Sequence, residues 1–150
     1  MELKHFLPSH ISVVPPFIDQ VMSFITRFRE VDGSEDDIEL ALREALLNAV
    51  IHGNAQDPYK RVYVTTRCNS DGEVSITIRD QGLGFDSRAV PDPTAPENRM
   101  CSHGRGIYLI RSLMDEVSFD EGGTVLHMRK SSPARPLQIT RKPVSCSLTD

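Results

Sequence analysis

The first third of the chain contains a short mixed stretch followed by apolar residues at a helical spacing. Residues 3–12 are mixed and are compatible with a short first strand. Pro15 and Pro16 then open a helical pattern, since proline is tolerated in a first helical turn where its missing N–H has no partner. Apolar residues follow at spacings of three and four, which predicts an amphipathic helix that ends before residues 32–33. These are Phe17, Val21, Phe24, Ile25 and Phe28.

A second helix is predicted to begin after Ser34. The Ser34 side chain is expected to cap the helix, and acidic residues at positions 35–37 favour the positive end of the helix dipole. The helix is expected to stop near His52-Gly53-Asn54, with Gly53 as the C-terminal cap. Its predicted buried face consists of Ile38, Ala41, Leu42, Ala45, Leu46, Ala49 and Val50.

The middle of the chain changes to a period of two. Residues 62–66 and 74–78 each alternate apolar and polar positions, and Asn69-Ser70-Asp71-Gly72 between them predicts a hairpin turn. An alternation of this kind is typical of an antiparallel sheet that is covered on one face only. A further helix is expected from near Gly106, and a closing hairpin over residues 117–128. The sequence therefore predicts an α+β fold with helices layered on one face of the sheet.

Two segments lack either period. Residues 86–102 contain three prolines and predict a long loop, which in a compact domain is often a lid or a binding loop. From Ser131 the chain is rich in proline, serine and arginine, and we expect residues 131–150 to form a flexible tail. One domain is therefore expected over residues 1–130.

Composition narrows the function classes. The chain is 39% hydrophobic and 25% charged, as in ordinary globular domains. The net charge of −4 and the absence of a Lys/Arg-rich block argue against direct binding of nucleic acid. No apolar stretch is long enough to span a membrane, and the N-terminus lacks a signal-peptide core. Three widely spaced cysteines indicate neither a disulfide framework nor a zinc site. These features favour the cytoplasm.

Candidate chemistry begins on the second predicted helix. Glu44, Asn48 and His52 are four residues apart and share one helix face. An amide oxygen such as that of Asn48 can ligate Mg²⁺, and a carboxylate such as that of Glu44 can accept a proton from an attacking hydroxyl. The alternative is that this triplet forms the solvated face of an amphipathic helix.

Two glycine-containing clusters follow. Asp80-Gln81-Gly82-Leu83-Gly84 comes directly after a strand, so its acid can accept a hydrogen bond from an amine such as adenine N6, and its glycines allow close approach to a flat base. Gly104-Arg105-Gly106 leads into a helix, whose N-terminal N–H groups favour anions. Arg99, His103 and Arg105 can add positive charge there. Each cluster alone is also compatible with an ordinary turn or loop. The chain contains neither a P-loop nor a GxGxxG motif.

In their order and separation, the three clusters resemble the GHKL ATPase superfamily, which includes gyrase, histidine kinases and mismatch-repair ATPases. Glu44-x-x-x-Asn48-Ala49-x-x-His52-Gly53 is similar to the N box of that family. Asp80-Gln81-Gly82-Leu83-Gly84 is similar to its G1 box, and His103-Gly104-Arg105-Gly106-Ile107 to its G2 box. The small size and the His-Gly-Asn that ends the N box are most similar to RsbW-type anti-sigma factor/serine kinases.

The resemblance implies a fold and a set of site residues. The fold would be a Bergerat-type α+β two-layer sandwich with a mixed, mostly antiparallel sheet. Asn48 would ligate Mg²⁺ in bound ATP, Glu44 would activate the substrate serine as general base, and Asp80 would bind the adenine amino group. Residues 86–103 would form an ATP lid. The remaining nucleotide-binding residues would be His52, Gly82, Gly84, Phe85, His103, Gly104, Arg105, Gly106 and Ile107.

The resemblance also implies an activity and partners. The chain would be a protein serine/threonine kinase that phosphorylates a STAS-type antagonist and an anti-sigma factor that binds a sigma factor, with possible homodimers. An alternative is a non-catalytic, ATP-dependent binding module that regulates another target. A histidine-kinase catalytic domain is disfavoured because no upstream dimerisation helix with a phosphoacceptor histidine is evident.

Overall fold

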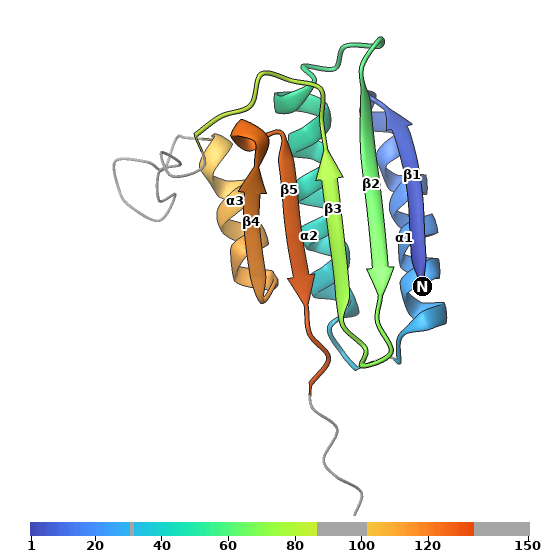
Figure 1. The fold of residues 1–150 in the computed structure, drawn as a ribbon. Helices are drawn as coiled ribbons and strands as arrows, with labels where there is room; N and C mark the ends of the chain where they lie inside the picture. The colour runs from blue at the N-terminus through green and yellow to red at the C-terminus, as the bar shows by residue number, and fades with distance from the viewer. Residues whose placement is uncertain (31, 87–101, 134–150) are drawn as a thin grey trace, which may run out of the picture.

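The computed structural model describes residues 1–30, 32–86 and 102–133, except for the side chains of residues 102–104. Within these ranges five strands, three α-helices and three short helical turns follow one another (Figure 1). In chain order they are β1 (Glu2–Pro8), η1 (Ile11–Val13), α1 (Val14–Phe28), α2 (Glu35–Leu47), η2 (Asn48–Gly53), β2 (Arg61–Cys68), β3 (Val74–Arg79), α3 (Ser102–Leu113), β4 (Glu116–Asp120), η5 (Glu121–Gly123) and β5 (Val125–Lys130).

The strands form one sheet in the order β1-β2-β3-β5-β4. All pairings among the described strands are antiparallel, so the sheet is not mixed as expected but antiparallel throughout this part of the chain. In the register Val64 faces Ile78, and Ile76 faces Met128, so apolar side chains of neighbouring strands meet on one face. The predicted α+β class and both predicted hairpins are confirmed.

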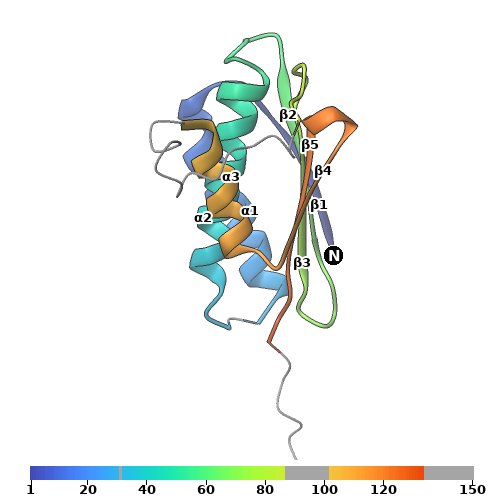
Figure 2. The ribbon, with the colours of Figure 1, turned by 90° about the vertical axis from the view of Figure 1, so that its left-hand side faces the viewer.

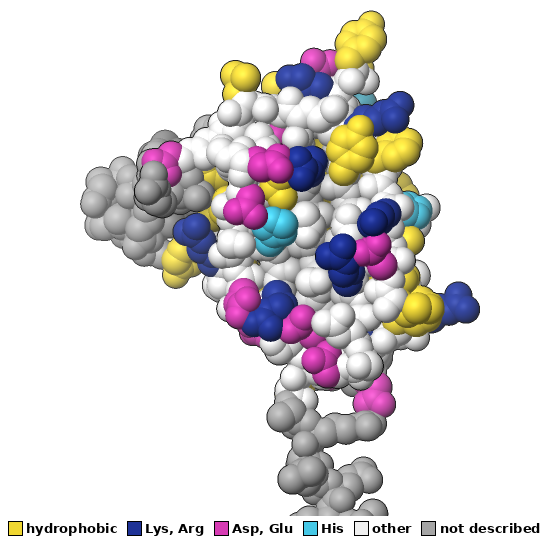
Figure 3. Space-filling view, in the orientation of Figure 1, with side chains coloured by type: hydrophobic (Ala, Val, Ile, Leu, Met, Phe, Trp, Pro, Cys, Tyr) yellow, Lys and Arg dark blue, Asp and Glu magenta, His cyan; other side chains and the backbone are white. Residues whose placement is uncertain are grey.

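The three α-helices cover one face of the sheet and leave the other open (Figure 2). The predicted apolar face of the second helix is buried in full between the two layers. The open face carries basic and acidic side chains in close proximity, including the ion pairs Arg79–Glu121 and Arg129–Glu73 (Figure 3). The alternation of polar and apolar strand positions therefore corresponds to the two faces of the sheet.

A buried arginine joins three segments at the end of α1. Arg29 is only 5% exposed, and its guanidinium donates hydrogen bonds to the Gly72 carbonyl at 2.6 Å, to Ser34 Oγ at 2.8 Å and to Asp32 at 2.6 Å. Because Ser34 Oγ accepts from Arg29 and donates to Asp32, it makes no capping bond to α2. Ser34 is the N-cap residue of α2, as predicted, but its side chain does not form the expected capping hydrogen bond. Glu35 instead accepts hydrogen bonds from the N–H groups of Asp32 and Gly33.

The second helical segment ends at Gly53, where the end was predicted, but its last part is not α-helical. The α-helical hydrogen bonds stop at Leu47 and a π-helical turn, η2, continues to Gly53. The C-cap residue is Asn54 and not Gly53 as predicted, and the next two residues, Ala55 (51°) and Gln56 (56°), have positive φ. Single π turns within helices are frequent at functional sites.

Among the described residues, no helix is long and apolar enough to cross a membrane.

Candidate functional site

A cavity of about 690 Å³ opens beside α2 and η2, within the size range of small-molecule sites. Its walls come from α2, η2, β3, α3 and the β4–β5 hairpin, and from the segments that follow η2 and β3. Sequence-predicted residues from all three clusters meet in it. They are Asn48, His52, Asp80, Gly84, Phe85 and Ile107.

Asp80 directly follows β3 at one side of this cavity. Its Oδ1 accepts a hydrogen bond of 2.8 Å from the Gly82 N–H, and its own N–H donates to the Thr124 carbonyl at 2.9 Å. Burial raises the pKa of the Asp80 carboxyl above its usual value, while the Gly82 N–H and the positive charge of Lys60 oppose this rise. Asp80 is therefore an acceptor held in a partly desolvated position.

The turn after Asp80 is fixed by one buried amide. Asn54 is 0% exposed; its Oδ1 accepts from the Gln81 N–H at 2.7 Å, and its Nδ2 donates to Ser9 Oγ at 2.8 Å and to the Arg61 carbonyl at 2.9 Å. The side chain thus connects the end of η2 to three other segments: the start of β2, the turn after Asp80 and the segment after β1. Sequence reasoning missed this residue, although it directly follows His52-Gly53.

Replacing Asn54 with alanine is expected to lower the free energy of unfolding by about 2 kcal/mol, because buried polar groups lose their partners. Urea denaturation followed by circular dichroism measures this. The matched control is Asn69→Ala in the exposed β2–β3 turn, where Asn69 bonds only to Glu73 among the described side chains. An equal decrease in the free energy of unfolding of both variants would show that the hydrogen bonds of Asn54 do not stabilise the fold more than an exposed turn residue does.

Gly53 and Gly82 let η2 and the Asp80 turn touch. A Cβ on Gly82 would lie 1.9 Å from the Gly53 carbonyl oxygen, and a Cβ on Gly53 would lie 2.4 Å from Asp80 Cγ. Real Cβ atoms do not approach other heavy atoms so closely. The structural role of Gly53 is therefore close packing against Asp80.

Glu44 and Asn48 face α3 at the other end of η2. A Cβ on Gly106 would lie 3.2 Å from both amide atoms of Asn48 and 3.2 Å from Glu44 Oε2. The helix α3 begins at Ser102 and not near Gly106 as predicted, so Gly106 lies inside it. Glu44 is half-buried beside the cavity, while Asn48 lines it. The absence of a side chain at Gly106 thus leaves room for Glu44, the predicted general base, and Asn48, the predicted Mg²⁺ ligand.

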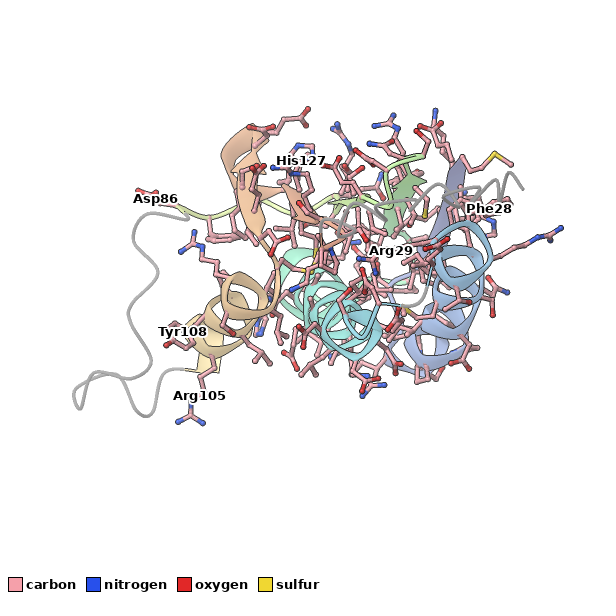
Figure 4. All side chains as sticks on the ribbon, turned by 90° about the horizontal axis from the view of Figure 1, so that it is seen from below. Phe28, Arg29, Asp86, Arg105, Tyr108 and His127 are labelled. Carbon is pink, nitrogen blue, oxygen red and sulfur yellow. The ribbon has the colours of Figure 1, made fainter. Side chains whose placement is uncertain are left out.

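The remaining predicted residues are not in the cavity wall or are not described. Arg105 is exposed, and its side chain points away from the sheet layer (Figure 4). His103 and Gly104 belong to the first turn of α3, but the side chain of His103 lies outside the described part of the chain. Most of the predicted lid of residues 86–103 and of the predicted tail of residues 131–150 also lies outside the described residues.

The cavity also contains residues that sequence reasoning did not single out as site residues. Lys60 comes from the segment between η2 and β2, and Phe119, Thr124 and Leu126 come from the β4–β5 hairpin. The hairpin was predicted only as a closing hairpin, and its Glu121-Gly122-Gly123 turn was given no part in the site. Its part in the site follows from its place in the sheet beside β3.

The arrangement suits a flat, polar-edged molecule. Ala49, Ile78, Ile107 and Leu126 provide apolar walls, and Asp80 provides a desolvated acceptor. No group of at least three His, Cys, Asp or Glu side chains that would hold a metal occurs in the described ranges. Mg²⁺ would therefore need oxygen ligands from a bound phosphate in addition to the Asn48 amide, which is a common arrangement for this ion.

Comparisons with known proteins identify relatives of this chain. An anti-sigma F factor of Oceanobacillus iheyensis is 33% identical over 117 residues, which cover 73% of this chain and 78% of that protein. An anti-sigma F factor of Heyndrickxia coagulans is 32% identical over 111 residues, covering 67% of this chain and 74% of that protein. Both relatives are thus matched over most of their length.

A solved structure and a family match extend the comparison. The structure of the RsbU and RsbW domains of a Mycobacterium tuberculosis protein aligns with a TM-score of 0.58 and 19% identity, covering 87% of this chain and 32% of that one, which supports the fold alone. Residues 7–130 match the histidine kinase-like ATPase domain family. Residues of the predicted N box and G1 box meet in one cavity, as this match implies. The chain belongs to the histidine kinase-like ATPase domain family.

Proposed function

We propose that the chain binds ATP with Mg²⁺ in this cavity and transfers the γ-phosphate to a serine of a protein partner. The observation that carries the proposal is the cavity itself: an apolar slot with the Asp80 carboxylate at one end of η2 and Asn48 beside Glu44 at the other. Asp80 accepts a hydrogen bond from the adenine amino group. Asn48 holds Mg²⁺ together with the phosphates, and this ion would offset the negative charge of the transferring group.

In this proposal Glu44 is the general base. Its carboxylate accepts the proton of the serine hydroxyl as the serine oxygen forms a bond to the γ-phosphorus, the bond from that phosphorus to the bridging oxygen breaks, and ADP leaves. Gly106 supports this role because its missing side chain leaves room for Glu44 and Asn48 side by side. His52, Gly84, Phe85 and Ile107 would form the nucleotide site around them.

The regulatory part of the proposal is supported by the relatives, which are named anti-sigma F factors. We infer that this chain binds a sigma factor and phosphorylates a STAS-type antagonist, in the cytoplasm and in part as a homodimer. The unphosphorylated antagonist would compete with the sigma factor for the chain. Phosphorylation would remove that competitor and return the sigma factor to the inhibited complex.

The test uses the purified chain, radiolabelled ATP·Mg²⁺, and the STAS-domain and sigma proteins encoded in the same genome. We expect label on one serine of the STAS protein and a sigma complex that elutes as one species in size-exclusion chromatography. ATP binding without transfer, together with a stable partner complex, would favour a non-catalytic, ATP-dependent binding module. Absence of ATP binding would refute both.

Replacing Gly106 with alanine is expected to slow phosphotransfer about tenfold, because a new Cβ at 3.2 Å forces Glu44 or Asn48 to shift by a few tenths of an ångström. The fold should be retained, since alanine favours a helix over glycine by about 1 kcal/mol. Single-turnover kinetics and a thermal melt measure the two effects. Ser112→Ala, on the exposed side of the same helix, is the control. Unchanged transfer in the Gly106 variant would show that this packing is not needed.

A further inference from the structure

Lys60 lies beside Asp80 because its backbone is held there. The Lys60 carbonyl accepts a hydrogen bond of 2.8 Å from Ser9 Oγ, which in turn accepts from the buried Asn54 amide at 2.8 Å. The next N–H, that of Arg61, donates to Gln81 Oε1 at 2.7 Å. The same network that fixes the turn after Asp80 therefore fixes Lys60 relative to it.

The side chain of Lys60 contributes the cavity's positive charge. Among the described residues that line the cavity, Lys60 is the only lysine or arginine. It forms no ion pair with a carboxylate in the described part of the chain, unlike Lys4, which pairs with Glu2 at 3.0 Å. Its charge acts on the Asp80 carboxylate, since it opposes the rise that burial causes in the pKa of Asp80. A hydrogen-bond donor and an acceptor thus share one end of the cavity.

Adenine has the complementary pattern along its edge. Its amino group is a donor, and each neighbouring ring nitrogen, N1 and N7, is an acceptor. At the corresponding edge guanine has a carbonyl in place of the amino group, which would face the Asp80 carboxylate with a second acceptor. A carboxylate paired with an ammonium group therefore fits adenine, whereas the carboxylate alone satisfies only half of that edge.

We propose that Lys60 donates a hydrogen bond to a ring nitrogen next to the adenine amino group, so that Lys60 and Asp80 recognise the base together. This assignment rests on the proposed function, because it requires that ATP occupies the cavity. It makes Lys60 a specificity-determining residue in a segment outside the three sequence clusters. Binding of GTP is expected to be weaker than binding of ATP, and this preference should decrease when Lys60 is replaced.

The experiment combines a side-chain change with single-atom changes in the nucleotide. Affinities of the wild type and of Lys60→Met are measured by isothermal titration calorimetry for ATP, 7-deaza-ATP and 1-deaza-ATP. We expect Lys60→Met to bind ATP about tenfold more weakly, as for the loss of one charged hydrogen bond. One of the two deaza analogues lacks the ring nitrogen that Lys60 contacts. It should bind the wild type about tenfold more weakly than ATP does, and it should bind Lys60→Met with no further loss of affinity.

Several results distinguish this assignment from its alternatives. Lys4→Met removes the same charge outside the cavity and should leave all affinities unchanged. Lys60→Met could instead lose affinity equally for all three nucleotides and regain it at higher pH. This result would show that Lys60 only keeps Asp80 ionised, and it would overturn the assignment of Lys60 but not the proposed function. Unchanged ATP affinity in Lys60→Met would do the same. A wild type that binds no ATP would overturn the proposed function as well.

Discussion

Replacing Glu44 with glutamine is expected to slow phosphotransfer to the antagonist about 10³-fold, the contribution typical of a positioned general base. Glutamine has the same shape but cannot accept the serine proton. ATP affinity should change less than about twofold, because Glu44 is not among the described residues that line the cavity. Single-turnover transfer from labelled ATP and calorimetric ATP titration measure the two quantities separately.

The control for this variant lies on the same helix. Glu39→Gln removes an equal charge from an exposed ion pair with Arg43, and should leave both transfer and ATP affinity unchanged. A Glu44→Gln protein that transfers phosphate at the wild-type rate would remove Glu44 from the role of base and leave it a structural neighbour of Gly106. A matched loss of ATP affinity would instead indicate that Glu44 acts in nucleotide binding.

Replacing Asp80 with asparagine is expected to weaken ATP binding about 100-fold, since a charged hydrogen bond is lost and an amide donor can face the adenine amino group. The fold should be retained, because the amide oxygen can still accept from the Gly82 N–H. Calorimetry measures the affinity and a thermal melt checks the fold. Asp71→Asn in the exposed β2–β3 turn is the control. Wild-type affinity in Asp80→Asn would return Asp80 to the role of a turn residue.

The same residue predicts a pH dependence. Burial raises the pKa of Asp80, so its carboxylate is protonated at a higher pH than that of an ordinary aspartate. The proposed hydrogen bond to adenine needs the ionised carboxylate. The affinity for ATP should therefore have its full value above this raised pKa and should decrease as the pH is lowered through it. Asp80→Asn has no such group and serves as the reference for protonation of the nucleotide itself. A parallel fall in both proteins would contradict the role of Asp80.

The sequence predicted those parts of the site that depend on local spacing. Asn48 and His52 lie in one wall because they are four residues apart on a helical segment, and Asp80 is in reach because it ends a buried strand. The two-layer arrangement followed from the apolar face of α2 and the alternation in β2 and β3. These features need only the period of an element and the direction of its apolar side chains.

The parts that sequence reasoning missed depend on contacts between distant segments. Gly53 was assigned to a helix cap, whereas the structure shows that its Cα packs on Asp80, 27 positions further along the chain. Lys60 and Thr124 have no local motif and join the site through the Asn54 network and the sheet order. Ser34 is the N-cap residue of α2 as expected, but its hydroxyl accepts a hydrogen bond from the buried Arg29 and does not cap the helix. For Gly53 and Ser34 a tertiary contact overrides a local preference, and for Lys60 and Thr124 only the tertiary contacts indicate the site.

The hydrogen bond from Asn54 to the Arg61 carbonyl holds the two ends of an exposed loop together. Between these two residues the chain passes through Ala55 and Gln56 in left-handed conformations and then Tyr59, which is 94% exposed. Since both ends of this loop are tied to the same amide, its length can change at the exposed tip without moving Asp80. Because Ala55 and Lys60 of the same loop line the cavity, an insertion near Tyr59 is expected to move these two residues while Asp80, whose turn is held by Asn54, stays in place.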